Sequence, residues 1–253
     1  MLEELLKLNV FAFFLIFARV GAVFMLLPGF SSDYVKPMMR LAVALGLSLM
    51  LMPFLMNSLP GMPETATGLG ILLIGEVIVG GFLGLVARVM TAALQTAGTL
   101  IALFSSLANA LIQDPITNQQ SSILASFMGT IGMTLLFITD LHHLMIRGIG
   151  ESYTLFVPGQ PLPLADFSAL VARRVADSFT LGVQLASPFI VTSMIYYIGL
   201  GILGRLMQAL PVFFVAMPLQ IGGQLMLLSL SLTTIFMYFL TRYEDNLIHM
   251  LEP

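Results

Sequence analysis

A few charged and amide side chains interrupt or end the long apolar runs of this sequence, and they are the groups that could do chemistry in it. They are Arg19, Glu76, Arg88, Gln95 and Arg205. Charged residues at membrane depth are rare and usually face a cavity or form an ion pair. Arg19 and Glu76 have opposite charges and lie in different apolar runs, so they can pair between two helices. We interpret such a pair as a lock between helices, because no chain of carboxylates or histidines accompanies it, as ion or proton passage would require.

A polar strip, Leu107–Gln120, follows a long apolar run, and hydrophobic sequence resumes directly after it. Asn109 and Gln113 are four positions apart and can share one helix face. Asp114 and Pro115 then predict the end of the helix, since the residue before a proline disfavours the helical region. Irregular backbone at membrane depth is tolerated only when it is buried in protein or lines a watery cavity. We therefore interpret these four residues as part of a pore plug; an ordinary loop outside the bilayer and simple helix–helix hydrogen bonding are the alternatives.

The histidines do not suggest a metal site. His142 and His143 follow Asp140, and adjacent residues on a helix point about 100° apart, which suits a shared metal ion badly. We interpret them as an interfacial pair at a helix end. The sequence has no cysteine and no HExxH, GxSxG or glycine-rich phosphate-binding pattern. We expect no catalytic residue, no metal and no cofactor.

Composition predicts an integral membrane protein. Of the 253 residues, 58% are hydrophobic and only 9% are charged, against about 25% charged in soluble domains. The net charge of −3 and the absence of a basic cluster argue against a nucleic-acid partner. We interpret the first apolar run as a retained helix rather than a signal, because Glu3 and Glu4 precede it where a signal peptide is positive.

The predicted fold is all-α. Spanning helices need about 20 mainly apolar residues, and the candidate runs are Val10–Pro28, Met38–Met56, Leu69–Met90, Thr91–Ile112, Ser122–Thr139, Phe179–Leu203 and Leu219–Thr241. The third and fourth runs are continuous and fit one long helix, a bent helix or a hairpin that turns near Arg88. The longest polar interval, Asp140–Ser178, contains an amphipathic helix for which Asp166 is a plausible N-cap.

Glycine spacing indicates that these helices pack against protein. Gly80 and Gly84 make the small-xxx-small spacing that lets two membrane helices approach closely. This pattern predicts either an obligate subunit of an assembly or a tightly packed transporter.

Several segments resemble one family, the type III secretion export-gate subunits that include the flagellar biosynthetic protein FliR and its virulence-type counterparts. The resemblance covers nearly all of the chain, and its order is more specific than any single piece. The matching segments are Ala18–Gly21, Leu27–Phe30, Pro37–Arg40, Gly75–Glu76, Leu85–Arg88, Gln95–Gly98, Asp114–Pro115, Gly201–Arg205 and Phe213–Gly222. One departure follows Arg205, where Leu-Met-Gln-Ala-Leu-Pro-Val stands in place of the usual Pro-Gln and Asn.

The resemblance implies an architecture of broken helical hairpins that assemble into a helical, pore-forming ring. Residues 1–165 would resemble one small gate subunit, and residues 166–253 would form a helical hairpin that resembles a second. The segment 105–122 would be the plug of the pore. The implied partners are FliP- and FliQ-like subunits in a hetero-oligomer, a FlhB-like switch subunit and unfolded secretion substrates. The implied location is the bacterial inner membrane at the flagellar basal body.

Two other function classes fit the sequence less well than the export gate does. A stand-alone transporter of ions or small molecules also uses broken helices at the midplane, but the sequence offers only amides and one possible Arg–Glu pair as a binding site. An intramembrane enzyme would need a nucleophile and a base. The sequence has no cysteine, and none of its three histidines lies centrally in an apolar run.

Overall fold

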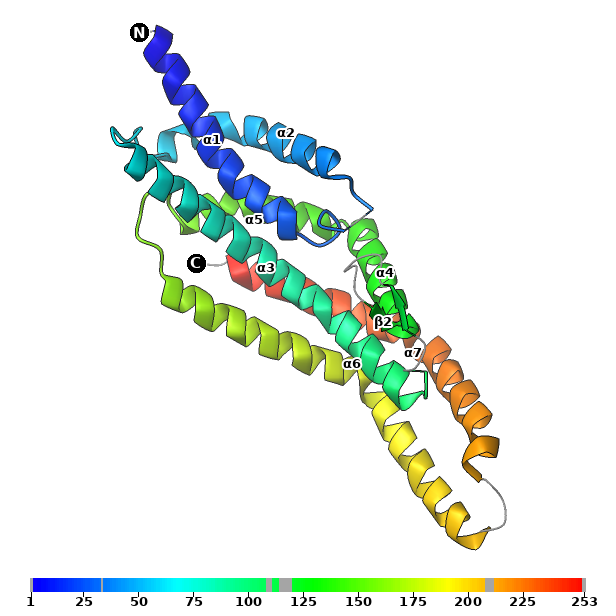
Figure 1. Cartoon of the computed structure of the whole chain (residues 1–253). Coiled ribbons are helices and arrows are strands. Elements are labelled where there is room, and N and C mark those ends of the chain that lie inside the picture. The colour runs from blue at the N-terminus through cyan, green and yellow to red at the C-terminus, as the bar shows by residue number, and fades with distance from the viewer. Residues whose placement is uncertain (1, 33, 108–110, 114–119, 208–211, 252–253) are drawn as a thin grey trace. The chain divides into compact units, whose positions relative to one another are not determined.

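The fold is seen in a computed structural model of the chain, which describes all residues except 1, 33, 108–110, 114–119, 208–211 and 252–253. Its elements in chain order are α1 (Leu2–Leu26), α2 (Pro37–Leu55), the short 3₁₀ helix η1 (Met56–Ser58), α3 (Ala66–Phe104), β1 (Leu111–Gln113), β2 (Gln120–Ser122), α4 (Ile123–Ile138), α5 (Leu141–Leu155), α6 (Leu164–Leu206) and α7 (Val212–Leu251) (Figure 1). The all-α class is confirmed, with one pair of three-residue strands added to it.

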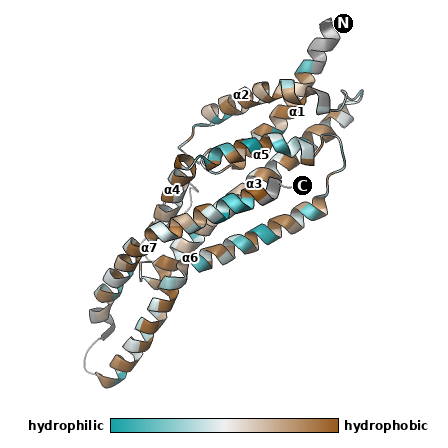
Figure 2. Cartoon of the chain, turned by 180° about the vertical axis from the view of Figure 1, so that it is seen from behind, coloured by the Kyte–Doolittle hydropathy of each residue, from teal (hydrophilic) through white to brown (hydrophobic). Residues whose placement is uncertain are grey.

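Five of the described helices are long and apolar enough to cross a membrane, or six if the bent pair α4–α5 counts as one span. Hydrophobic residues dominate these helices, whereas hydrophilic residues are frequent along α5 and the first half of α6 (Figure 2). The prediction of an integral membrane protein is therefore confirmed.

Three expectations about individual helices are settled. The two continuous apolar runs form a single helix, α3, of 39 residues without a hairpin at Arg88. The polar interval contains a whole helix, α5, that was not expected, as well as the start of α6. Asp166 is not an N-cap, because α6 begins at Leu164 and places Asp166 in its first turn, where a carboxylate still interacts favourably with the helix dipole.

The chain divides into two compact units whose segments alternate along the sequence. Unit 1 contains 1–90, 137–175 and 244–253, and unit 2 contains 91–136 and 176–243. In unit 1, α1 is held against α3 through the small residues of the Gly80–Gly84 pair. A Cβ added to Gly84 would lie 2.9 Å from the carbonyl oxygen of Val23, and one added to Gly80 would clash with the carbonyl oxygen of Arg19. The expected close approach of two helices is present here.

Unit 2 packs the last turns of α3 against α4, α6 and α7. A Cβ on Gly98 would lie 2.5 Å from the Cα of Ala125 on α4, and one on Gly182 would lie 2.9 Å from the Cβ of Thr96. Phe189 and Phe239 are fully buried in this unit. Glycines thus bring α4 and α6 close to the same end of α3.

Candidate functional site

Arg19 and Glu76 form the ion pair that the sequence made possible. The Nε of Arg19 donates to Oε2 of Glu76 at 2.7 Å, and Nη2 donates to Oε1 at 3.1 Å. Arg19 is fully buried and Glu76 is 3% exposed. Such a two-pronged arrangement is the strongest geometry that a guanidinium and a carboxylate can adopt, and it joins α1 to α3.

The remaining donors of the Arg19 guanidinium point at α5. Nη1 donates to the carbonyl oxygen of Ser152 at 3.0 Å and to its Oγ at 3.2 Å, and Nη2 donates to the carbonyl oxygen of Phe156 at 2.8 Å. The Cζ of Arg19 lies 3.9 Å from the ring centroid of Tyr153. All five N–H groups of the guanidinium therefore have an acceptor inside the protein. We call Arg19, Glu76, Ser152, Tyr153 and Phe156 the Arg19 lock.

The acceptors for Arg19 lie at the carboxyl end of α5. The carbonyl end of a helix carries partial negative charge, and Ser152 and Phe156 lie in and just after the last turn of α5. The carbonyl oxygen of Ser152 also accepts the N–H of Phe156 at 2.8 Å, so Arg19 uses its second lone pair. Arg19 supplies donors and positive charge at this end. The pair thus connects three helices of unit 1, and this third helix was not foreseen from the sequence.

α3 ends earlier than the sequence indicated. The N–H of Leu107 donates to the carbonyl oxygen of Ala102 at 2.9 Å, and that of Ser106 donates to Leu103 at 3.4 Å. Ser106 has φ 61°. This is a Schellman motif, which stops a helix with one left-handed residue. The expected helix up to Ile112, and with it the shared helix face of Asn109 and Gln113, is wrong.

The segment 105–122 contains a small hairpin of strands instead. β1 and β2 pair antiparallel, with Leu111 opposite Ser122 and Gln113 opposite Gln120. Of the four residues expected in the plug, Gln113 ends β1, whereas Asn109, Asp114 and Pro115 lie outside the described residues. The strand ladder satisfies backbone groups that an irregular strip would leave unpaired, which is what an apolar environment demands.

A polar cluster holds the end of α3 where this segment begins, and the sequence analysis missed it. The carbonyl oxygen of Phe104 accepts hydrogen bonds from Oγ of Ser193 and from Nε2 of Gln220, both at 2.9 Å. Gln220 also donates to the hydroxyl of Tyr197 at 3.0 Å. The sequence shows the residues of this cluster as amides and hydroxyls within the apolar runs of α6 and α7. The cluster fixes the root of the segment 105–122 on both helices.

The other predicted site residues are Arg88, Gln95 and Arg205. Arg88 is exposed on α3, Gln95 is half-buried further along the same helix, and Arg205 is exposed in the last turn of α6. A basic residue in a last turn complements the helix dipole, which accounts for Arg205 locally. No common site of these three residues is seen in the described part of the chain.

The two histidines are closer together than expected. Potential ligand atoms of Asp140, His142 and His143 all lie within 4.8 Å of one another, and the two rings are 4.1 Å apart between centroids. Nδ1 of His143 lies 3.3 Å from Oδ1 of Asp140, and His142 stacks on Phe137. Asp140 has φ 59° between α4 and α5, a conformation that Asp and Asn tolerate better than other residues with side chains. A polar contact between His143 and Asp140 and ring stacking thus hold this cluster at a helix start.

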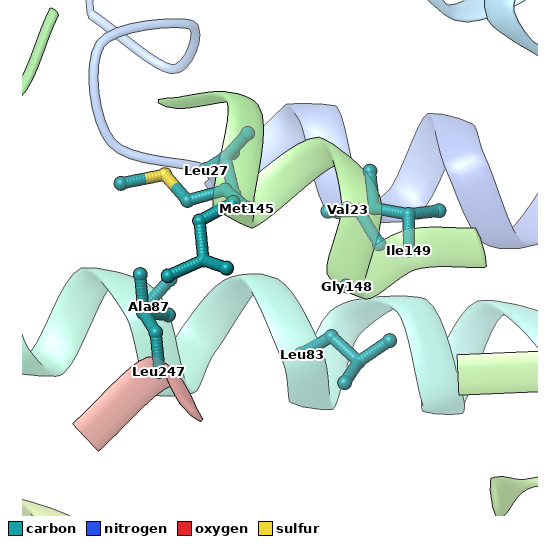
Figure 3. Close-up of a pocket in the computed structure, with 9 residues that line it drawn as sticks. Val23, Leu27, Leu83, Ala87, Met145, Gly148, Ile149 and Leu247 are labelled. Carbon is teal, nitrogen blue, oxygen red and sulfur yellow. The ribbon is translucent and has the colours of Figure 1, made fainter. Parts of the chain in front are cut away.

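A small internal cavity in unit 1 is apolar. Its volume is about 20 Å³, and side chains of α1, α3, α5 and α7 point toward it (Figure 3). It is lined by Val23, Leu27, Leu83, Ala87, Leu144, Met145, Gly148, Ile149 and Leu247. A cavity of this size holds at most one water molecule, which needs two or more polar partners to stay. It is a packing gap and not a binding site.

The described part of the chain has long apolar helices, a buried arginine whose charge is fully paired, and a short hairpin of strands between α3 and α4. These features define a polytopic membrane protein. Its sequence matches the bacterial export proteins, family 1, over residues 10–245. The chain belongs to this family.

Curated relatives support the assignment. The flagellar biosynthetic protein FliR of Caulobacter vibrioides is 41% identical over 233 residues, which cover 92% of this chain and 93% of that protein. FliR of Bacillus subtilis is 29% identical and covers 89% of this chain and 87% of its own length. The Yop proteins translocation protein T of Yersinia pestis is 24% identical, with 87% and 85% covered. The resemblance to the export-gate family is thereby confirmed.

Proposed function

We propose that this chain is an export-gate subunit of a flagellar-type type III secretion apparatus. It forms part of the pore through which unfolded substrates leave the cytoplasm during flagellum assembly. The observation that carries the proposal is the similarity to a flagellar relative over 92% of the chain. The apparatus lies in the bacterial inner membrane, at the flagellar basal body.

The partners are other membrane subunits. They are two smaller hydrophobic proteins, FliP-like and FliQ-like, in one hetero-oligomer with this chain, and a FlhB-like switch subunit that joins it. Residues 1–165 take the place of a subunit of the first kind, and residues 166–253 take the place of the second. Large exposed apolar side chains along the described helices, such as Phe54 and Leu219, suit a chain that is covered by lipid and by other subunits.

The segment 105–122 acts as the plug of the pore. Its backbone leaves α3 at a helix stop and returns through β2 into α4. The hydrogen bonds of Ser193 and Gln220 to Phe104 hold its root. A fixed root suits a plug that is displaced while the end of α3 stays in place. The chain does no covalent chemistry, and other components of the apparatus supply the energy.

The native mass of the tagged chain tests this function. The chain is extracted gently from membranes in which its neighbours are also expressed. We expect a large hetero-oligomer that contains one copy of this chain and several copies of two small hydrophobic proteins. A stable monomer or homodimer without companions would overturn the gate and favour a stand-alone transporter.

A further inference from the structure

Asp140, His142 and His143 form a cluster of side chains that the proposed plug and the Arg19 lock do not use. We call it the α5-start cluster, because Asp140 directly precedes α5 and both histidines lie in the first turn of this helix (α5 in Figure 1). All three residues belong to unit 1. A carboxylate and two imidazoles are side chains with which proteins bind Zn²⁺ and other divalent transition-metal ions.

The two histidine rings converge, although adjacent residues on a helix point about 100° apart. Their centroids are 4.1 Å apart, and their planes are tilted by 35°. An imidazole stands away from the backbone on two rotatable bonds, which lets neighbouring rings approach each other in the first turn of a helix. Helix geometry therefore does not separate this pair, and the two rings can share an ion, contrary to the expectation from the sequence.

The distances within the α5-start cluster suit ligands of one ion. Nδ1 of His143 lies 3.3 Å from Oδ1 of Asp140. Two ligand atoms that each lie about 2.1 Å from a tetrahedral zinc ion are about 3.4 Å apart, so these two atoms already have the required separation. Potential ligand atoms of all three residues lie within 4.8 Å of one another, so a small movement of side chains brings the third ligand into range.

The exposure of the three side chains allows this movement. The ring of His142 is half-buried and stacks on Phe137, with 5.0 Å between the centroids. Its Nδ1 is enclosed and has no hydrogen-bond partner among the residues that the structure describes, so Nε2 is the nitrogen left for an ion from solvent. The side chains of Asp140 and His143 are 75% and 70% exposed, so they can rotate onto an ion that His142 holds.

The charges around the cluster also favour a cation. In the described part of the chain, Asp140 forms no salt bridge with an arginine or a lysine, so its carboxylate is available to a metal ion. Arg147 lies one turn further along α5 than His143. Its Nε is paired with Oε1 of Glu151 at 2.6 Å, and this partner offsets the repulsion that Arg147 exerts on a nearby cation.

We propose that Asp140, His142 and His143 bind a divalent transition-metal ion of the zinc type. One carboxylate oxygen and one nitrogen of each imidazole supply three ligands, and solvent completes the coordination. Zn²⁺ accepts this mixture of nitrogen and oxygen ligands, whereas Mg²⁺ and Ca²⁺ prefer oxygen ligands alone. The ion joins the left-handed residue before α5 to the first turn of the helix, so it stabilises the helix start. The site is independent of the proposed export function.

Zinc titration of the whole chain in detergent tests the site. The chain is purified with a tag that contains no histidine and is treated with a chelator, and calorimetry then measures the binding of Zn²⁺ and of Mg²⁺. We expect one Zn²⁺ per chain and no saturable binding of Mg²⁺ at the same concentrations. Zn²⁺ should also raise the Tm, because an ion that binds only the folded state stabilises it. Absent or non-saturable zinc binding, or equal binding of Mg²⁺, would overturn the proposal.

Substitutions that keep the local contacts identify the ligands. Asp140→Asn retains a residue type that tolerates a φ of 59°, and His142→Phe retains a ring that can stack on Phe137. Each of these variants, and His143→Gln, should weaken zinc binding at least about tenfold, since losing a group that merely orients a ligand already costs roughly 10–100-fold. The Tm without zinc identifies any variant that does not fold, and the other variants then decide.

Matched substitutions elsewhere in the chain are the controls. Asp166→Asn makes the same change at an exposed aspartate in the first turn of α6, and His249→Phe removes the third histidine of the chain. Both should leave the zinc affinity within about twofold of wild type, because neither residue belongs to the ligand set. An equal loss in the controls, or unchanged affinity in the folded cluster variants, would show that zinc binds adventitiously and would overturn the site.

Discussion

Arg19 on α1 and Glu76 on α3 are 57 positions apart in the sequence and form two parallel hydrogen bonds, of 2.7 and 3.1 Å, inside unit 1. The same guanidinium also donates to the backbone carbonyls of Ser152 in α5 and of Phe156 just after it. Arg19 thereby holds three helices together, so its contribution to the free energy of unfolding can be measured by substitution.

Removing one partner of this pair should be costly. Arg19→Ala leaves the Glu76 carboxylate buried without its cation, and we expect a loss of about 3–5 kcal/mol in the free energy of unfolding. The double replacement Arg19→Met with Glu76→Leu should lose less, because it leaves no unpaired charge. Denaturant titration of the purified chain in detergent measures both.

The exposed pair of Arg147 and Glu151, with an N–O distance of 2.6 Å, is the control for this experiment. It lies four positions apart on α5, and Arg147→Ala should cost only about 0.3–0.5 kcal/mol. An Arg19→Ala variant that loses no more than this control would show that the Arg19 lock is not holding unit 1 together.

The crossing of α1 and α3 can be tested with two adjacent glycines. Gly80→Ala brings a methyl group against the carbonyl oxygen of Arg19, and the helices must separate, at a cost of about 1–3 kcal/mol. Gly81→Ala meets nothing within 4 Å and should gain up to about 1 kcal/mol from helix propensity. The two variants should therefore shift the Tm in detergent in opposite directions. Equal shifts would refute the close approach.

The stop at the end of α3 depends on a left-handed serine. Ser106→Gly removes the steric strain of a φ of 61°, and we expect a gain of up to about 1 kcal/mol, since left-handed backbone costs an L-residue roughly 1–2 kcal/mol. Ser106→Val should destabilise the same turn. Hydrogen exchange at the amide of Leu107, which donates to Ala102, reports the change, and slower exchange in the valine variant than in wild type would contradict the motif.

The plug assignment predicts a leak. Replacing residues 114–119 with Asn-Gly keeps the strands β1 and β2 in register, because this dipeptide favours a two-residue hairpin turn. The shortened segment should raise the conductance of the assembled gate for small ions while the hetero-oligomer keeps its mass. Planar-bilayer recordings of wild-type and shortened assemblies compare the two. Equal conductance of the wild-type and shortened assemblies would show that the segment 105–122 is not the plug.

Much of the helical framework could be predicted from the sequence, since a helix that spans a membrane needs a long apolar run. The opposite charges of Arg19 and Glu76 were also visible, because a charge is conspicuous among apolar residues. The contact of this pair with α5 could not be predicted, since Ser152 and Phe156 accept through backbone carbonyls, which every residue has and no sequence pattern marks.

The end of α3 was misplaced for a related reason. Proline at 115 is a clear stop signal, but the actual stop is Ser106, and a serine in the left-handed region leaves no trace in sequence comparable to a glycine. The strands β1 and β2 have only three residues each, too few to show the alternation that predicts a strand. Gln220 was visible as an amide in an apolar run, yet only the fold brings it to the carbonyl oxygen of Phe104.

The length of α3 has a further consequence for the membrane around it. At 1.5 Å per residue, a helix of 39 residues is about 58 Å long, whereas the hydrocarbon layer is about 30 Å thick. A tilt of 0–40°, the range that spanning helices adopt, shortens its projection only to about 45 Å. Hydrophobic mismatch of this size exceeds what lipids relieve by local thickening. A helix that is apolar over nearly its whole length must therefore continue beyond the lipid and be shielded there by protein.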